Sequence, residues 1–223
     1  SQSEAVNEKW AEAWNSKRLG LGVADSVYGP WEFSTEPILQ PRPGKWDSAI
    51  TTNPAPCVGP DGRLYVLYKS GNVKHTVGPY AGRFRLGCAR AELDDLKFER
   101  LADTQIALDD DPDTHIEDPC LWHDGERFHL LVKDMTGEVC GEAEAGIYAS
   151  STDGQNWYTG SSKLAYSRHL TWGDGSPAHQ RKLERPQALI EDGWPAYLFF
   201  GTVDMGQDGE FERAWNLVFE VDR

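Results

Sequence analysis

Asp118 and Glu184 are the side chains in this sequence whose type and spacing best fit catalysis. Asp118 directly precedes Pro119 and Glu184 stands two residues before Pro186, and they lie roughly 65 residues apart, the interval at which a strand motif repeats along the chain. Cleavage of a glycosidic bond requires two carboxyl groups in one cleft, one protonated to release the leaving oxygen and one ionised to activate water or tune its neighbour. Each residue alone could instead cap a strand by bonding backbone groups. Because the two are matched between repeats, we interpret them as a catalytic pair.

The repeated motif that carries these carboxylates is a strand, a tight turn and a second strand. In residues 116–133 an Asp-Gly turn is followed by apolar residues that alternate with others, the pattern of a β-strand. The upstream copy begins at Asn53 and the downstream copy at Glu184. Glycine marks each turn because it adopts a positive φ at little cost. The three turns are Asp61-Gly62, Asp124-Gly125 and Asp192-Gly193.

Each repeat continues with further predicted strands, which gives four strands per repeat, the unit of a β-propeller blade. An outer strand pair is also predicted at residues 20–33, and a short helix at residues 3–16. The sequence therefore predicts an all-β propeller with a short N-terminal helix. Because blades radiate from one axis, we expect the starts of the inner strands, at Asn53, Asp118 and Glu184, to converge at one mouth.

The composition and net charge of the chain limit the classes of ligand and partner that it can bind. The chain has 223 residues, nine tryptophans and a formal net charge of −14. That charge argues against nucleic acid and anionic membranes as partners, and suits a neutral or cationic ligand. The sequence has no apolar stretch long enough to span a membrane, and it leaves the oligomeric state open.

The cysteines and the N-terminus say little about compartment. Cys57 and Cys120 are expected to be buried free thiols, and no paired-cysteine motif suggests zinc. We predict no cofactor and no metal site, and no sequence feature supports a central structural Ca2+. The chain starts at Ser1 rather than methionine, so localisation is not readable from that end, and we favour a periplasmic or secreted location.

The sequence resembles the five-bladed β-propeller glycoside hydrolases of the family 43 type, which are related to families 32, 62 and 117. The resemblance covers the whole chain through short motifs. These are Gly29-Pro30-Trp31, Trp46-Asp47-Ser48 with Asn53-Pro54, Glu117-Asp118-Pro119 and Leu183-Glu184-Arg185-Pro186-Gln187. It implies a glycoside hydrolase that cleaves a plant or algal oligosaccharide or polysaccharide with inversion, through a single attack by water.

The resemblance also implies a role for each carboxylate. In that group one Asp is the general base, a second Asp adjusts the pKa of the acid and orients it, and a Glu is the general acid. Asp118 takes the second role and Glu184 the third. The base is expected about two blades before Asp118, ahead of Ser1. Asp47 is the nearest carboxylate that could replace it, and we carry it as a candidate.

Around these carboxylates we expect side chains that hold sugar hydroxyls or stack on sugar rings. The candidate substrate-binding residues are Trp46, Asn53, Lys69, His115, Lys133, Asp134, His179 and Arg185.

Three other functions stay open. The chain could be a carbohydrate-binding propeller without catalysis, which the missing base favours. It could be a glycoside phosphorylase, which needs basic residues for phosphate in the cleft. It could also be a structural scaffold, which needs no convergent carboxylates.

The strand count also bears on completeness. Three full repeats and the outer pair at residues 20–33 make about three and a half blades, whereas the resemblance implies five. We therefore expect residues 1–223 to form a single propeller domain that lacks its first one to two blades. In the alternative, residues 20–33 complete a blade with the C-terminal strand, the ring closes with four blades, and Asp47 becomes the leading candidate base.

Overall fold

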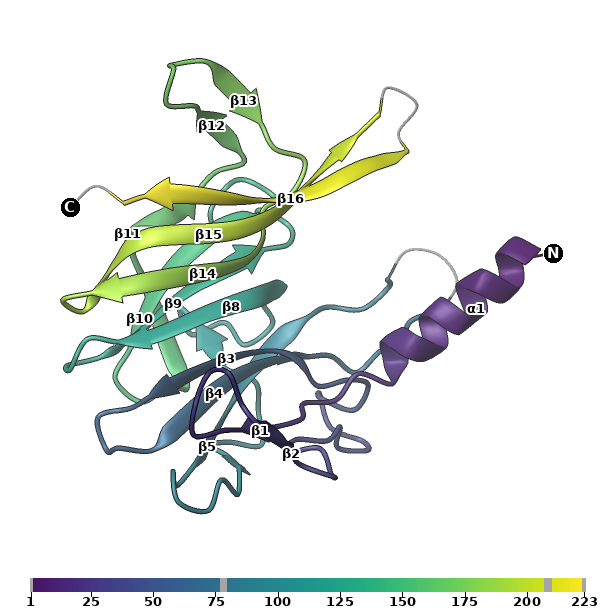
Figure 1. Ribbon diagram of the computed structural model, residues 1–223, viewed down its shortest axis with the longest axis vertical. Coiled ribbons are helices and arrows are strands. Elements are labelled where there is room, and N and C mark those ends of the chain that lie inside the picture. The colour runs from purple at the N-terminus through teal and green to yellow at the C-terminus, as the bar shows by residue number, and fades with distance from the viewer. Residues whose placement is uncertain (1, 77–79, 207–209, 222–223) are drawn as a thin grey trace.

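The structure is a computed structural model that describes residues 2–76, 80–206 and 210–221. In these residues one helix precedes sixteen strands (Figure 1). The elements are α1 (Gln2–Asn15), β1 (Gly22–Val23), β2 (Glu32–Phe33), β3 (Thr52–Val58), β4 (Leu64–Ser70), β5 (Arg85–Ala91), β6 (Glu99–Arg100), β7 (Ala107–Leu108), β8 (Ile116–His123), β9 (Phe128–Asp134), β10 (Ala145–Ser151), β11 (Asn156–Tyr166), β12 (His169–Thr171), β13 (Pro177–His179), β14 (Glu184–Glu191), β15 (Trp194–Met205) and β16 (Phe211–Glu220).

The strands form successive antiparallel blades, which confirms the predicted all-β propeller fold with a short N-terminal helix. The first blade is β3-β4-β5-β6, and the second is β8-β9-β10-β11, with β7 added parallel to β11. The third blade is β14-β15-β16, so the prediction of four strands in this repeat is wrong for the described residues. The turn glycines Gly62, Gly125 and Gly193 all have positive φ, as the Asp-Gly pattern predicted.

The first strand of each blade lies on the inside, where β8 is flanked by β3 and β14 (Figure 1). This arrangement brings together segments of the chain that are far apart in sequence. The main core fills the space between the first two blades, where Leu67, Leu130, Ile147 and Trp157 are almost fully buried. Burial of such large apolar side chains stabilises the fold by roughly 1.5–3 kcal/mol each. The inner strands are thereby held on a packed support.

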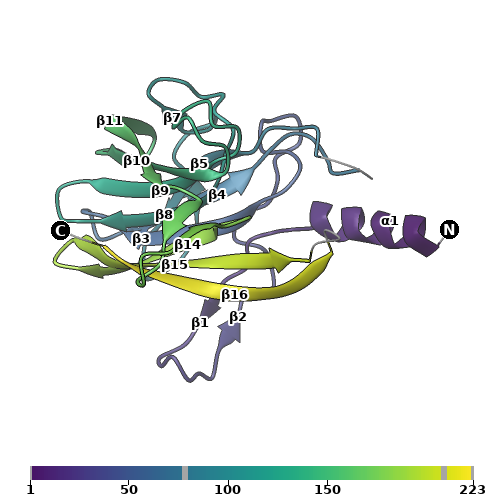
Figure 2. The same ribbon diagram turned by 90° about the horizontal axis from the view of Figure 1, so that it is seen from above.

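The predicted outer pair at residues 20–33 forms a small hairpin of its own, in which Gly22 pairs with Phe33. This hairpin projects from the blades (Figure 2). Strand β16 pairs with β15, and in the described residues β1 and β2 pair only with each other. The alternative in which this hairpin completes the C-terminal blade is therefore wrong.

Cys57 and Cys120 are free thiols, as predicted, and so are Cys88 and Cys140. Cys120 is buried, but Cys57 is only half-buried, so the expectation of burial is wrong for Cys57. Burial raises the pKa of both thiols to about 11. In the part of the chain that the structure describes, no helix has the length and apolar character needed to cross a membrane.

Candidate active site

The three inner strands share a backbone irregularity that aligns the repeats residue by residue. Asn53, Asp118 and Arg185 each precede a proline and each have positive φ, at 49°, 56° and 52°. A proline disfavours the right-handed helical region for the residue before it. Each of these residues lies where the pairing to the next strand shifts register. Such irregularities redirect side chains at the ends of strands.

This alignment corrects the predicted equivalence by one position. Asp118 matches Arg185, and Glu117 matches Glu184. The same irregularity in the first blade puts Thr52 opposite Lys69, just as Glu117 is opposite Lys133. The sequence pattern alone matched Glu184 with Asp118, because both are acids close to a proline. Asp118 directly precedes its proline, whereas Glu184 stands one position further from its own.

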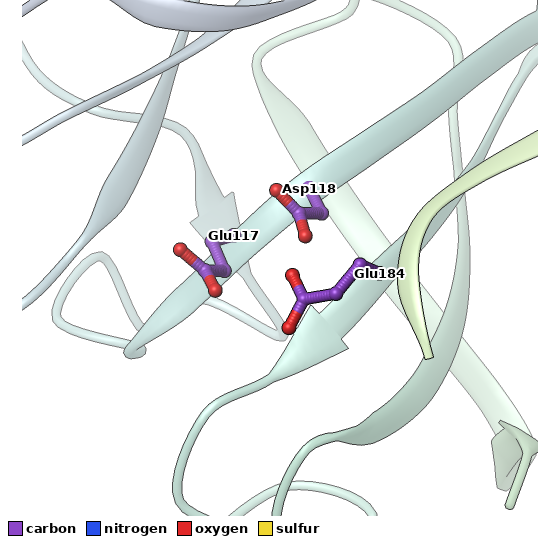
Figure 3. A group of neighbouring side chains, drawn as sticks. All are labelled: Glu117, Asp118 and Glu184. Atoms are coloured by element: carbon purple, nitrogen blue, oxygen red, sulfur yellow. The ribbon is translucent and has the colours of Figure 1, made fainter. Parts of the chain in front are cut away.

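Glu117, Asp118 and Glu184 form a carboxylate cluster at the start of the inner strands β8 and β14 (Figure 3). One oxygen from each lies within 4.8 Å of the others. Glu117 and Asp118 come from β8 and are buried, and Glu184 comes from the start of β14 and is partly exposed. The predicted convergence of Asp118 and Glu184 is therefore present, together with a third carboxylate, Glu117, that the sequence analysis did not select.

Lys133 at the end of β9 holds the carboxylate cluster together. Its ammonium Nζ lies 2.8 Å from Glu117 Oε1, 3.2 Å from Asp118 Oδ2 and 2.8 Å from Glu184 Oε2. The Lys133 side chain is only 2% exposed. Three like charges at this separation repel strongly in a buried setting, so the ammonium is what allows the carboxylates to share the space.

Two further lysines complete the charge balance. Lys69 Nζ lies 2.6 Å from Glu117 Oε2 and over the ring of Phe84, and both charged groups are mostly buried. Lys182 Nζ lies 3.4 Å from Glu184 Oε1 at the more open side. Three lysines thus balance three carboxylates.

These charges set the protonation states. Burial acts to raise the pKa of Glu117, but the Lys69 and Lys133 charges outweigh it and hold that pKa below its usual value. Burial likewise acts to raise the pKa of Glu184, and Lys133 again outweighs it, so that pKa is also lowered. For Lys133 burial acts to lower the pKa, and the carboxylates reverse the effect and raise it. In the free protein Glu184 is therefore ionised at neutral pH.

Asp118 is fixed by groups from both neighbouring blades. The amide Nδ2 of Asn53 donates to its Oδ1. The backbone N–H of Arg185 donates to its Oδ2 at 3.2 Å. With Lys133 as the third partner, the carboxylate has little rotational freedom, which suits an orienting role.

Two cavities open beside the carboxylate cluster. The first, of about 300 Å³, is lined by Thr52, Asn53, Pro54, Asp118, Pro119, Arg185 and Gln187. The second, of about 470 Å³, is lined by Glu184, Arg185, Gln187, Phe199, Phe200, Gly201 and Asn216. Arg185 and Gln187 line both cavities. Asp118 lies in the wall of the first cavity, and Glu184 lies in the wall of the second.

Asp47 lies elsewhere. It is fully buried, and its oxygens lie 2.9 Å from Nε of Arg42 and 2.9 Å from Nε of Arg100, while the Tyr68 hydroxyl donates to it at 3.1 Å. These partners occupy both oxygens, and the carboxylate joins loop and blade. The structure does not bring Asp47 to the carboxylate cluster, which corrects the expectation that it could reach the cleft. Trp46 beside it packs against the ring of Tyr68, with centroids 6.0 Å apart, and also lies away from the cluster.

Two other predicted sugar ligands have structural partners. Asp134 is buried and accepts hydrogen bonds from backbone N–H groups of Thr136, Gly137, Val139 and Cys140, so it shapes the loop after β9. His179 on β13 stacks on His169 of β12, with ring centroids 4.2 Å apart. The His179 hairpin lines a larger cavity of about 840 Å³ that also includes Lys182.

His115 lies just before β8, and its ring is edge-on to Phe84. It is half-buried, and burial lowers its pKa. Its Nε2 is buried without a hydrogen-bond partner among the described residues. Phe84 also lies under the Lys69 ammonium that bonds Glu117, so His115 lies near the carboxylate cluster and, among the described residues, does not bond to it.

Glu117 and Lys182 are the site residues that the sequence analysis missed. Glu117 had a signal, since it stands two residues before Pro119 as Glu184 stands two residues before Pro186. Lys182 had none, because its contact with Glu184 depends on the approach of the chain to β14.

The carboxylate cluster has the donor chemistry of a site for a hard cation. The Lys133 ammonium, however, already bonds all three carboxylates at their point of closest approach. A metal ion there would face this positive charge at close range. The residues present therefore do not fit a central Ca2+ at this position.

No family model and no curated protein matches the chain. Solved structures do. The structure of BT0996 in a complex with RGII has a TM-score of 0.59 at 13% identity, over 91% of this chain and 56% of the other. A thermostable family-43 glycoside hydrolase has a TM-score of 0.55 at 14% identity, over 83% of this chain and 57% of the other.

A third structure is Zg3597, a family 117 glycoside hydrolase produced by the marine bacterium Zobellia galactanivorans. Its TM-score is 0.54 at 17% identity, over 89% of this chain and 50% of the other. The chain thus spans about half the length of the structures it matches. The fold is that of the propeller glycoside hydrolases of the family 43 and family 117 type, which agrees with the resemblance found in the sequence.

Proposed function

We propose that the protein is a glycosidase, and that the carboxylate cluster is its catalytic centre. The observation that carries this proposal is the convergence of Asp118 and Glu184 from adjacent blades, with oxygens within 4.8 Å, beside open cavities. Cleavage of a glycosidic bond by an enzyme of this kind needs carboxyl groups in different protonation states. The similarity of fold to glycoside hydrolases supports this reading.

In the proposed reaction Glu184 is the general acid. Its carboxyl group gives a proton to the glycosidic oxygen as the bond from that oxygen to the anomeric carbon breaks. Water adds to the anomeric carbon and loses its proton to a general base, so the products are two free hydroxyl-terminated sugars. Asp118, fixed by Asn53 and by the backbone of Arg185, orients Glu184 and tunes its pKa.

This role requires a change at Lys133. Glu184 is ionised in the free protein because its carboxylate lies 2.8 Å from the Lys133 ammonium. We infer that bound substrate shields Glu184 from solvent and separates it from Lys133, so that its pKa rises and it takes up a proton before cleavage. Glu117 keeps Lys133 in place during this change because it bonds the same ammonium.

The substrate we propose is an oligosaccharide or polysaccharide of plant or algal origin, cleaved with inversion. Support comes from the polar side chains in the wall of the first cavity, Thr52, Asn53 and Gln187, and from the marine source of one of the similar structures. Inversion would be recognised by the anomer that forms first, observed by proton NMR during the first turnovers.

A second candidate function is carbohydrate binding without catalysis. The observation that favours it is the pairing of all three carboxylates with lysines, which lowers the pKa of Glu117 and Glu184. A binding module needs no protonated acid. In this alternative the carboxylate cluster is a rigid polar surface that hydrogen-bonds sugar hydroxyls.

Measuring saccharide cleavage and saccharide binding in parallel distinguishes a glycosidase from a binding module. The purified chain is incubated with plant and algal saccharides, and new reducing ends are measured alongside binding by calorimetry. If the protein is a glycosidase, the wild type cleaves a saccharide and Glu184→Gln abolishes cleavage. The control Glu126→Gln, on an exposed turn, leaves cleavage unchanged. Binding that is the same in the wild type and in Glu184→Gln, with no turnover in either, identifies a binding module.

A further inference from the structure

Positive side chains gather beside the carboxylate cluster, although the chain as a whole carries a net charge of −14. Lys69, Lys133 and Lys182 each bond a member of the cluster, so their charges are balanced. Lys17 and Arg185 are different. Among the described residues neither has a carboxylate partner within ion-pair distance. Their two positive charges therefore add to a carboxylate cluster whose own charges are already balanced by three lysines.

Arg185 is placed to contact a ligand. Its backbone is fixed, because its N–H donates to Asp118 and its φ of 52° is shared with the matching positions of the other blades. Its side chain is exposed and lines both cavities beside the carboxylate cluster. A guanidinium group presents paired N–H donors that match the oxygens of a carboxylate or a sulfate.

Lys17 lies near the carboxylate cluster through a chain of aromatic contacts: its ammonium is over Trp14, Trp14 packs against Phe84, and the Lys69 ammonium that bonds Glu117 lies over Phe84. Lys17 follows α1, and its backbone carbonyl accepts a hydrogen bond of 3.3 Å from the N–H of Thr51, next to the cavity-lining Thr52. Its ammonium lies over the ring of Trp14, 5.1 Å from the centroid, and the residue is half-buried. Burial, followed by the positive charges of Lys69 and Arg185, lowers its pKa. A bound anion would relieve this unfavourable setting.

We propose that Lys17 and Arg185 bind an anionic group of the substrate, a uronate carboxylate or a sulfate ester, on a sugar held beside the carboxylate cluster. This inference rests on the proposed function. It replaces the expectation from net charge, which favoured a neutral or cationic ligand. Net charge describes the whole surface, whereas recognition depends on the charges that face the ligand at close range.

The anion does not face net repulsion from the carboxylate cluster, because the three carboxylates are paired with three lysines. The polar side chains of Thr52, Asn53 and Gln187 in the first cavity can bond the sugar hydroxyls around the anion. A wholly neutral sugar in this place would leave two unpaired positive charges partly removed from water, which costs free energy.

The test compares three saccharides by calorimetry at low salt: a galacturonate oligomer, the same oligomer after reduction of its carboxyl groups, and a sulfated galacto-oligosaccharide. Wild-type protein is expected to bind one of the two anionic saccharides at least about tenfold more tightly than the neutral one, because charge-assisted hydrogen bonds are strong. The preference is expected to fall as salt is added. The anionic saccharide that binds identifies the group as a carboxylate or a sulfate.

Lys17→Gln and Arg185→Gln are each expected to remove most of this preference, and Arg185→Lys to restore part of it. Lys97→Gln is the matched control, because Lys97 is 84% exposed and pairs only with an acid outside the two cavities beside the cluster. Near-ultraviolet circular dichroism checks that every variant is folded. Equal binding of neutral and anionic saccharides, absence of binding by all three, or an equal effect of Lys97→Gln would overturn the proposal.

Hydrolysis is followed in the same samples. Selective binding of an anionic saccharide without cleavage supports the anion site and counts against glycosidase activity. Cleavage of neutral saccharides that is unaffected by Lys17→Gln and Arg185→Gln supports glycosidase activity and overturns the anion site.

Discussion

Glu117 and Glu184 occupy equivalent positions of adjacent blades, and each lies 2.8 Å from the same ammonium, that of Lys133. The equivalence follows from the shared positive-φ residue that stands after each of them. One lysine therefore links two blades through two matched acids. The site is a product of the repeat, because the same irregularity in neighbouring strands aims both side chains at one point.

Removal of the Lys133 charge is expected to destabilise the protein. Lys133→Met keeps the volume of the side chain but removes the ammonium that the buried carboxylates of Glu117 and Asp118 share. Loss of one partner of a buried ion pair costs about 3–5 kcal/mol of unfolding free energy. Urea denaturation measures this loss. The exposed control Lys97→Met is expected to stay within about 0.5 kcal/mol of the wild type, and an equal loss in both variants would contradict the special role of Lys133.

Glu184→Gln is expected to lower the rate of glycoside cleavage by at least about a hundredfold, because the amide cannot donate the proton that the leaving oxygen needs. The amide keeps the shape of the side chain, so binding of the saccharide is expected to change far less. Initial rates on a cleaved substrate, with calorimetric binding in parallel, separate the two effects. Turnover equal to that of the wild type would rule Glu184 out as the acid.

Glu117 is expected to make stability depend on pH. Its folded-state pKa lies below the ordinary value of 4.5, because Lys69 and Lys133 outweigh burial. A group with a lowered folded pKa stabilises the protein above its unfolded pKa, and that stability is lost as the pH falls through the folded value. Thermal midpoints of the wild type should therefore decline below about pH 4.5.

The matched variant for this dependence is Glu117→Gln. It cannot ionise, so it should be less stable at pH 7 and should show a shallower decline towards acid pH. A decline as steep as that of the wild type would assign the pH dependence to other carboxylates.

Much of the fold was predictable, because alternation of apolar residues and Asp-Gly turns are local signals. The repeat placed Asp118 and Glu184 on neighbouring inner strands, and the structure brings them together. The predicted register was wrong by one position, because it aligned the acids rather than the prolines, and only the structure shows that the residue before each proline has positive φ. Once this is known, Glu117 rather than Asp118 matches Glu184.

The lysine contacts were less predictable. Lys69 and Lys133 were selected as sugar ligands because they end equivalent strands, but whether such an ammonium meets a sugar or an acid depends on the approach of the neighbouring blade. Asp134 shows the same limit. Its place after Lys133 suggested the cleft, whereas alternation along the strand turns it towards its own loop.

Asp47 is expected to contribute to stability and not to catalysis. Its carboxylate lies between Arg42 and Arg100, and it is fully buried. Asp47→Asn is expected to cost about 3–5 kcal/mol of unfolding free energy, because two guanidinium groups lose their shared charge partner. The folded variant should cleave substrate at a rate within a few-fold of the wild type, since Asp47 does not bond to the carboxylate cluster. Urea denaturation and initial rates, measured on the same preparation, check both parts. A loss of rate of about a hundredfold or more with unchanged stability would instead assign Asp47 the general-base role.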